Sequence, residues 1–433
     1  MKLTLEAGRS QQAGSRLGFD YDWGPTMPAK NTKSSDIVIS GGGMVGMILG
    51  GGLAQQGITI TIVDREVTAA HLDPKFDGRS SAIAFASCQM LKALGIWKFM
   101  GAEAEAIREI RVSDGPSLLH LHFDHQDLGE GPLGYMVENR HIRHGLFQWA
   151  AQIEGLTIVA PHEVTGYKPL SGGAVVTLKS GQKITCQLVI AAEGRGSRLR
   201  KLAGIRTTIL PYHQTGIVTT IEHELPHLGI AHERFLPDGP FAILPLGGNR
   251  ASLVWTTSEE LAPTIMGLSQ RAFDAEIQKR VGDFLGRVKA LDHRWSYPLS
   301  LQVAEDYTAP RLALVGDAAH GIHPIAGQGL NLGLRDVGAL IEVLAGAHKS
   351  GSDLGADHVL AAYARWRRVD NLLLIAVTDI LNRLFSNRSR ALRLARDVGL
   401  GLVNRQAGLK RFFMRQARGT VGKLPKLLRG RKI

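Results

Sequence analysis

The stretch Asp36-Ile37-Val38-Ile39-Ser40-Gly41-Gly42-Gly43-Met44-Val45-Gly46 decides the fold of this chain of 433 residues. Its apolar first half predicts a short buried strand, and the small residues that follow as far as about Gln56 predict a closely packed helix. A second predicted strand, residues 58–63, ends at Asp64. A Gly-x-Gly-x-x-Gly turn between a strand and a helix, with an acid after the next strand, is typical of a dinucleotide-binding βαβ unit.

The three glycines of this turn have different physical roles. Gly41 permits a tight turn, Gly43 lets the backbone approach a pyrophosphate, and Gly46 lets the helix and the strand pack closely. The phosphates are expected at the N-terminus of the helix, where free N–H groups and the helix dipole favour anions. Asp64 is expected to accept hydrogen bonds from an adenosine ribose. The turn suits both FAD and NAD, so other segments have to distinguish them.

Two later segments also pass from an apolar strand into a glycine-rich turn. In Leu188–Arg200 the turn contains Glu193-Gly194 and several arginines, which suits cofactor phosphates, although a solvated basic helix start is the alternative. Arg311–Asn331 predicts a strand that ends at Asp317, a loop, and then a helix, although a purely structural strand–helix corner is the alternative. A carboxylate at the end of that strand suits a polyol or a phosphate, and the backbone N–H groups of residues 327–330 suit the electron-rich edge of a reduced flavin.

In this order the three segments resemble the fingerprints of the group A flavoprotein monooxygenases, which share the para-hydroxybenzoate hydroxylase fold. Within that group the sequence most resembles the ubiquinone-biosynthesis hydroxylases (2-polyprenyl-6-methoxyphenol hydroxylase-like). The resemblance covers about residues 36–428 and rests on four stretches: Asp77–Ala84, Val137–Arg140, Gly239–Leu246 and Gly316–Asp336. The sequence departs from the family pattern at Glu193, where Asp is usual, and at Asp64, where Glu is frequent.

The resemblance implies FAD as the cofactor, with NAD(P)H as a transient co-substrate that reduces it and O₂ as the source of the transferred oxygen. The implied cofactor-binding residues are Gly41, Gly43, Gly46, Asp64, Arg79, Arg140, Asp317, Gly327, Gln328, Gly329, Leu330 and Asn331. No metal site is expected. A substrate phenol has a pKa near ~10 and requires a base or a donor, but no catalytic residue is assigned. His320 and His323 are candidates, and backbone-satisfied loop histidines are the alternative.

The implied reaction is hydroxylation of a polyprenylated phenol in ubiquinone biosynthesis. On the same fold, the alternatives are a soluble aromatic-ring hydroxylase, a flavin reductase of prenyl lipids, and a flavoprotein scaffold without catalytic activity. A nucleic-acid-binding protein is suggested only by net charge, since the sequence lacks a zinc module or an interleaved aromatic platform.

The expected fold class is α/β, with a Rossmann-like FAD-binding domain, an interleaved antiparallel-sheet substrate domain and C-terminal helices. The expected divisions are a disordered leader (1–35), a discontinuous FAD-binding domain (36–110, 136–212 and 301–345), a substrate domain (111–135 and 213–300) and a basic helical segment (346–433). Alternating apolar residues over 215–257 predict an antiparallel sheet. Its apolar residues are expected either to face the substrate or to pack in the core: Phe241, Ile243, Leu244, Pro245 and Trp255.

The net charge of +12 is confined to the C-terminus. Residues 365–433 contain 18 Lys and Arg and 3 acids, a net charge of +15, so the preceding 364 residues carry −3. Helical apolar spacing recurs over 371–385 and 409–424, with basic residues among the second set. This pattern favours docking to an anionic membrane surface or to other quinone-biosynthesis proteins, with solvated capping helices as the alternative. Since the chain has only Cys88 and Cys186, it is expected in the reducing cytoplasm. The basic segment further predicts that it associates peripherally with the inner membrane.

Overall fold

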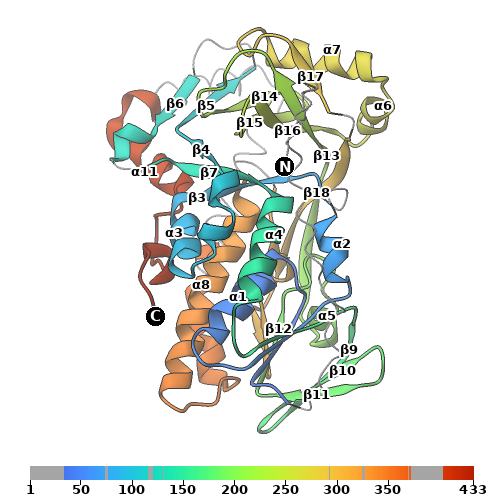
Figure 1. Cartoon of the computed structure of the whole chain (residues 1–433), viewed down its shortest axis with the longest axis vertical. Helices are drawn as coiled ribbons and strands as arrows, with labels where there is room; N and C mark the ends of the chain where they lie inside the picture. Colours follow the sequence, from blue (N-terminus) through green and yellow to red (C-terminus); the bar gives the residue numbers. More distant parts are fainter. Residues whose placement is uncertain are drawn as a thin grey trace, which may run out of the picture. The chain divides into compact units, whose positions relative to one another are not determined.

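The computed structural model describes residues 34–73, 77–115, 120–129, 131–291, 293–323, 327–368, 370–371 and 403–433 (Figure 1). The predicted leader up to residue 33 and nearly all of the predicted helix over 371–385 lie outside these residues.

A six-stranded sheet carries the first predicted strand at its centre. Its order is β19 (Thr308–Ala309), β20 (Leu312–Leu314), β12 (Leu188–Ala191), β1 (Ile37–Ser40), β2 (Ile60–Val63) and β8 (Leu156–Val159). All neighbours pair in parallel except β19 with β20. Because both faces of such a sheet are covered, its strands are apolar throughout rather than alternating, and β1 and β2 are buried at every position.

Helices α1 (Met44–Ala54), α4 (Asn139–Ala150) and α8 (Gln328–Lys349) lie side by side against this sheet (Figure 1). A β-carbon on Gly51 would lie 2.3 Å from the Trp149 ring, and one on Gly52 would lie 2.5 Å from Ile341. The predicted close packing of the first helix is therefore confirmed, and its glycines admit neighbouring side chains. A three-stranded antiparallel sheet shares the same core: β9 (Val164–Leu170), β10 (Gly173–Leu178) and β11 (Lys183–Cys186).

The predicted antiparallel sheet over 215–257 is confirmed as part of a nine-stranded sheet. Its members are β5 (Glu109–Asp114), β6 (His120–Asp124), β13 (Thr207–His223), β14 (Ile230–Leu236), β15 (Gly239–Leu246), β16 (Arg250–Ser258), β17 (Val288–Ala290), β18 (Trp295–Ala304) and β21 (His320–Gly321). Helices α6 (Ala262–Met266) and α7 (Gln270–Val281) pack on one of its faces (Figure 1).

The two faces of β15 meet different neighbours. Phe241 and Ile243 are buried with Trp255 of β16 in a core beneath α7, around Phe273. Leu244 points to the other face, where it packs in a separate cluster that contains Met136. Phe241, Ile243 and Trp255 therefore pack in the core, which was one of the two predicted possibilities. Of the residues named in this paragraph from β15 and β16, Leu244 lies on the face away from α7.

A small sheet joins these two larger ones. It contains β3 (Ser80–Ala84), β7 (Gly134–Glu138) and β4 (Glu105–Ile107). The remaining described elements are short: α2 (Thr68–Leu72), α3 (Phe85–Ala93), α5 (Arg198–Leu202), η1 (Trp97–Phe99), η2 (Gly101–Glu103), η3 (His125–Leu128), η4 (Gly316–Ala318), η6 (Leu427–Arg429) and a helical stretch over 357–368.

Near the C-terminus, α11 (Ala407–Ala417) packs beside η3. The sequence pattern predicted that this helix would continue to Leu424, which is wrong. Gly419 (φ +71°) directly follows the C-cap Arg418 and ends the helix in a left-handed conformation, and Gly422 (φ +89°) is left-handed in the chain that follows. No helix among the described ranges is long and apolar enough to cross a bilayer.

Candidate cofactor and substrate site

The three predicted fingerprint segments meet at one edge of the parallel sheet. Strands β1, β12 and β20 lie next to one another and run in the same direction, so their carboxyl ends share that edge. The chain leaves β1 toward β2 on one side, and it leaves β12 toward β20 on the other. Such a reversal opens a crevice between the two strands, where doubly wound sheets bind nucleotides.

The glycine turn after β1 has the shape that a pyrophosphate requires. Gly41 has φ +108°, and a β-carbon there would lie 2.4 Å from the carbonyl oxygen of Ala192. On Gly46 a β-carbon would lie 2.0 Å from the carbonyl oxygen of Gly41, whereas on Gly43 it would meet no atom of the described residues within 4 Å. Gly43 is also the N-cap of α1, and no side chain caps this helix end. The open space and uncapped N–H groups therefore fit an anion, as FAD requires.

Asp64 lies at the end of β2, adjacent to this turn. Its carboxylate accepts hydrogen bonds from the backbone N–H groups of Gly42 and Glu66, and Nε2 of His71 lies 3.2 Å away. Burial opposes ionisation, but the hydrogen bonds with His71, Glu66 and Gly42 outweigh it and hold the pKa of Asp64 below its ordinary value. The three partners leave about one of roughly four lone-pair sites for a ribose hydroxyl.

Glu193, where the sequence departs from the family pattern, supports its own turn. One carboxylate oxygen accepts from Ser40 Oγ at 2.7 Å, and the other accepts from Ser197 Oγ at 2.5 Å and from Leu199 N at 3.0 Å. The side chain thus fastens the end of β1 to the start of α5. The longer Glu side chain reaches these partners, and its role in this structure is to hold the turn.

Asp317 is exposed at the end of β20 while residues on both sides of it are buried. Its Oδ2 lies 3.8 Å from Nε of Arg195, whose guanidinium also donates to Ser300 Oγ at 2.8 Å. Gly316 just before it has φ +59° and lies against Val45 in the first turn of α1. The exposed carboxylate therefore stands beside the glycine turn, where a ligand can reach both.

Arg79 and Arg140 are each held by an acid two residues earlier in the chain. Arg79 donates to both oxygens of Asp77 at 2.8 and 3.0 Å, and Arg140 donates to Glu138 at 3.0 Å. Both guanidiniums remain about half exposed. Since Ser80 pairs with Glu138 across β3 and β7, the two acid-x-Arg units lie on neighbouring strands.

Asp77 and Glu138 hold the two predicted arginines, and the sequence analysis assigned neither acid a role. Burial opposes their ionisation, but Arg79 and Asn139 lower the pKa of Asp77 to about 2. His141 and two arginines likewise lower the pKa of Glu138 to about 2. Both carboxylates are therefore charged at neutral pH and orient the arginines. The repeated acid-x-Arg spacing, Asp77-Gly-Arg79 and Glu138-Asn-Arg140, was a signal available in the sequence.

At the start of α8, Gly327 has φ +62°, and a β-carbon there would lie 2.8 Å from Ala82 of β3. Asn331 clamps these two elements together, since it accepts from Ala84 N at 2.8 Å and donates to Ala82 O at 2.7 Å. Its side chain is therefore committed to the protein. A β-carbon on Gly329 would meet no atom of the described residues within 4 Å, so the backbone at Gly329 and Leu330 is the part of this turn that a ring can approach.

The structure separates the two candidate histidines. His320 is buried with its Nε2 2.6 Å from Asp336, which makes it a structural residue. His323 is 1% exposed, and neither of its ring nitrogens has a partner within the described ranges. Its ring lies edge-on to Tyr212 of β13 at 5.1 Å. Burial, aided by the charge of Arg195, lowers the pKa of His323 to about 4, so the imidazole is neutral at pH 7.

Comparison with known proteins agrees with this arrangement. Residues 34–369 match the FAD binding domain family. The chain is 48% identical to the ubiquinone hydroxylase UbiL of Rhodospirillum rubrum, covering 92% of this chain and 93% of that protein. It is 37% identical to the 3-demethoxyubiquinol 3-hydroxylase of Escherichia coli, covering 89% and 98%.

Among solved structures, the p-nitrophenol 4-monooxygenase of Pseudomonas putida shares the fold, with a TM-score of 0.75 at 17% identity over 90% of this chain and 99% of that one. The predicted α/β fold class is therefore confirmed. The chain belongs to the FAD-binding monooxygenase family that includes the ubiquinone-biosynthesis hydroxylases, and it is an FAD-dependent monooxygenase.

Proposed function

We propose that this monooxygenase hydroxylates the ring of a polyprenylated phenol in ubiquinone biosynthesis, with O₂ and NAD(P)H as co-substrates. One observation carries the proposal: the three fingerprint turns converge at one sheet edge in a chain that is 48% identical to a ubiquinone hydroxylase over 92% of its length. A similarity that extends over the substrate sheet as well as the nucleotide turns supports a shared substrate class.

FAD supplies the redox and oxygen chemistry when it is bound, and the protein supplies orientation and charge. The uncapped start of α1 at Gly43 would hold the pyrophosphate, and Asp64 would accept from the ribose. Asp317 would contact the polar chain of the cofactor, and the backbone N–H groups at Gly329 and Leu330 would face the flavin ring.

The two predicted arginines also supply charge rather than redox chemistry. Arg79 and Arg140, half exposed and oriented by their acids, would supply positive charge to FAD or to the incoming nicotinamide nucleotide. In the described ranges, the βαβ unit with a Gly-x-Gly-x-x-Gly turn is the one formed by β1, α1 and β2. If FAD occupies it, NAD(P)H binds transiently at another surface.

We also propose that residues 36–110, 136–212 and 301–345 bind FAD, and that residues 111–135 and 213–300 form the substrate side. The basic segment 346–433 would dock at the inner membrane or at other quinone-biosynthesis proteins. A polyprenyl tail keeps the substrate in the bilayer, so the enzyme has to reach it at the membrane surface. Exposed Leu409 and Phe412 on α11, next to basic residues, support this placement.

The test is deletion of the gene followed by analysis of the quinone precursors that accumulate. The proposal expects a precursor that lacks one ring hydroxyl, and restoration of the quinone by the wild-type chain. With purified protein, O₂ uptake that depends on NAD(P)H and on the accumulated precursor is expected. Unchanged quinone synthesis would contradict the pathway. Uptake with a short-chain phenol but not with the precursor would favour a soluble hydroxylase, and saturation of the prenyl chain without O₂ uptake would favour a reductase.

A further inference from the structure

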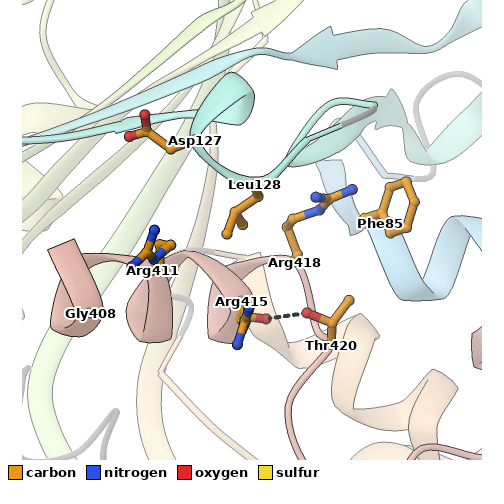
Figure 2. Close-up of a pocket in the computed structure, with 8 residues that line it drawn as sticks. All are labelled: Phe85, Asp127, Leu128, Gly408, Arg411, Arg415, Arg418 and Thr420. Atoms are coloured by element: carbon orange, nitrogen blue, oxygen red, sulfur yellow. Dashed lines mark hydrogen bonds between the residues drawn. The ribbon is translucent and has the colours of Figure 1, made fainter.

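A groove of about 700 Å³ lies between η3 and α11 (Figure 2). Its lining residues are Phe85, Asp127, Leu128, Gly408, Arg411, Arg415, Arg418 and Thr420. None of them belongs to the predicted FAD contacts, so the groove is separate from the cofactor site described above. It is basic, with three arginines and a single acid in its lining.

The arginines follow one face of the helix and its C-terminal residue. Arg411, Arg415 and Arg418 are spaced i, i+4 and i+7, which brings their side chains to the same side. Like charges at this spacing repel one another. Within the described part of the chain neither Arg411 nor Arg415 makes an ion pair, and both are exposed. An anion between them would relieve this repulsion.

The third arginine is fixed at the inner end of the groove. Arg418 is 6% exposed, and its guanidinium carbon lies 4.0 Å from the centroid of the Phe85 ring. Figure 2 shows its side chain between Leu128 and Phe85. A guanidinium held over an aromatic face is pre-organised for a planar, bidentate interaction with an oxyanion.

The acid in the lining does not neutralise the arginines. Asp127 pairs with Lys410 Nζ at 2.7 Å, on the neighbouring side of the helix. Figure 2 shows Asp127 on η3, across from Arg411. With Asp127 and Lys410 paired, the groove keeps the charges of the exposed Arg411 and Arg415. Guanidinium groups bind phosphate through paired N–H···O bonds, so a phosphate group is the anion that this lining fits best.

Exposed apolar side chains on the same helix distinguish between the sources of such a phosphate. Leu409 is 39% exposed and Phe412 is 49% exposed, one helical turn apart and adjacent in sequence to Lys410 and Arg411. A free phosphate or a nucleotide gives large apolar side chains no partner. At about 100° per residue, Phe412 lies roughly 60° around the helix from Arg415, and Leu409 lies further round on the same flank. The apolar side chains therefore border the arginine face, and at a bilayer surface phosphate groups and acyl chains likewise occur within a few ångströms of each other.

We propose that this groove binds the phosphate of an anionic phospholipid while Leu409 and Phe412 enter the bilayer surface. Only the biological role of this lipid site rests on the proposed function: lipid binding would bring the enzyme to a substrate held in the membrane. Lipid binding itself is measured without turnover, so the two proposals fail separately.

The experiment is co-sedimentation of the full-length, FAD-loaded protein with phosphatidylglycerol vesicles, and in parallel with phosphatidylcholine vesicles. Wild type is expected to prefer phosphatidylglycerol. R411Q/R415Q is expected to lower the partition coefficient by about 30-fold, the combined effect of two basic residues near an anionic surface. L409S/F412S is expected to reduce binding to phosphatidylglycerol without making it independent of lipid charge.

The matched control is R271Q/K279Q, which also removes two exposed basic residues, here from α7. It is expected to bind vesicles like wild type. Equal binding of wild type to both lipids would overturn the proposal. An equal loss of vesicle binding in R411Q/R415Q and in the control R271Q/K279Q would also overturn it. If R411Q/R415Q instead raised the KM for NADPH and left vesicle binding unchanged, the groove would be a nucleotide site.

A turnover assay separates this inference from the proposed function. With the phenol in detergent micelles, R411Q/R415Q is expected to retain the wild-type kcat, and with the phenol in phosphatidylglycerol vesicles it is expected to lose rate. Binding of wild type to vesicles without hydroxylation in either medium would reject the proposed function and leave the lipid site standing. A loss of rate in detergent equal to that in vesicles would reject the lipid site.

Discussion

Arg367 donates a hydrogen bond from Nε to Oδ1 of Asp336 at 2.8 Å, and neither side chain is exposed to solvent. The other carboxylate oxygen accepts from Gly316 N at 3.0 Å and lies 2.6 Å from His320 Nε2. Burial opposes ionisation of Asp336, but the charges of His320 and Arg367 outweigh it and hold its pKa below the ordinary value. The buried pair therefore ties the third fingerprint turn to α8 and to the helical stretch over 357–368.

Replacement of Arg367 by methionine is expected to destabilise the protein by about 3–5 kcal/mol, because the buried charge of Asp336 would lose its partner. Urea unfolding of the FAD-loaded protein measures this. The control is R368M, whose side chain is half exposed and lies 3.8 Å from Asp306, with an expected cost of about 1 kcal/mol or less. Equal unfolding midpoints for R367M and R368M would show that the pair does not support the turn.

Two glycines of the first fingerprint are expected to respond differently to alanine. A β-carbon on Gly46 would lie 2.0 Å from a backbone oxygen, so G46A is expected to cost about 3 kcal/mol or more. On Gly43 a β-carbon meets no atom within 4 Å in the part of the chain that the structure describes, so G43A is expected to fold normally. It would occupy the space proposed for the pyrophosphate and raise the Kd of FAD by about tenfold or more. Thermal unfolding and FAD titration separate the two effects.

Gly346 provides the control for these variants. It lies in α8, and a β-carbon there also meets no atom within 4 Å. G346A is expected to stabilise the protein by about 0.5–1 kcal/mol, since alanine loses less conformational entropy in a helix. Its FAD affinity is expected to equal that of wild type. Normal FAD binding by G43A would reject the proposed position of the pyrophosphate.

The parallel-sheet edge was predictable from sequence because its signals are local. The apolar strand before Gly41 and the turn residues around Gly316 lie within a few positions of one another. The partner of Asp336 was not predictable, because Arg367 is 31 residues away in the chain and only packing brings them together. The end of α11 was predictable from Gly419, but helical apolar spacing continues past this glycine to Leu424 and hides the signal.

The orientation of β15 could not be obtained from its sequence. Nearly every position of this strand is buried, because α7 covers one face and the cluster around Met136 covers the other. Without polar residues on alternate positions, the pattern does not distinguish the two faces. For the same reason the sequence allowed Phe241 to face the substrate, whereas in the structure it packs beneath α7. Asn331 likewise has a suitable position for FAD, but its amide joins α8 to β3.

Asp77 and Arg79 are expected to differ in how much each supports the fold. Asp77 is buried and also accepts from Asn139 at 2.8 Å and from the buried Arg143 at 3.1 Å. D77N leaves Arg143 without its carboxylate and is expected to destabilise the protein by about 3 kcal/mol or more. Arg79 is half exposed, so R79Q is expected to keep the wild-type stability and to lose FAD affinity or raise the KM for NAD(P)H. Wild-type FAD affinity and wild-type KM in R79Q would exclude a ligand-directed role for Arg79.

His323 is expected to make stability depend on pH in the acidic range. Its pKa falls from an unfolded value near 6.5 to about 4 because the ring is buried, so the unfolded state takes up the proton first. There is no loss above pH 6.5; stability falls between pH 6.5 and 4, by about 3 kcal/mol in total, and then levels off. H323L lacks this titration, so the difference in unfolding free energy between wild type and H323L is expected to change across that window. A constant difference from pH 7 to 4 would show that folding does not lower the pKa of His323, which would then titrate near 6.5 in the folded protein as it does in the unfolded chain.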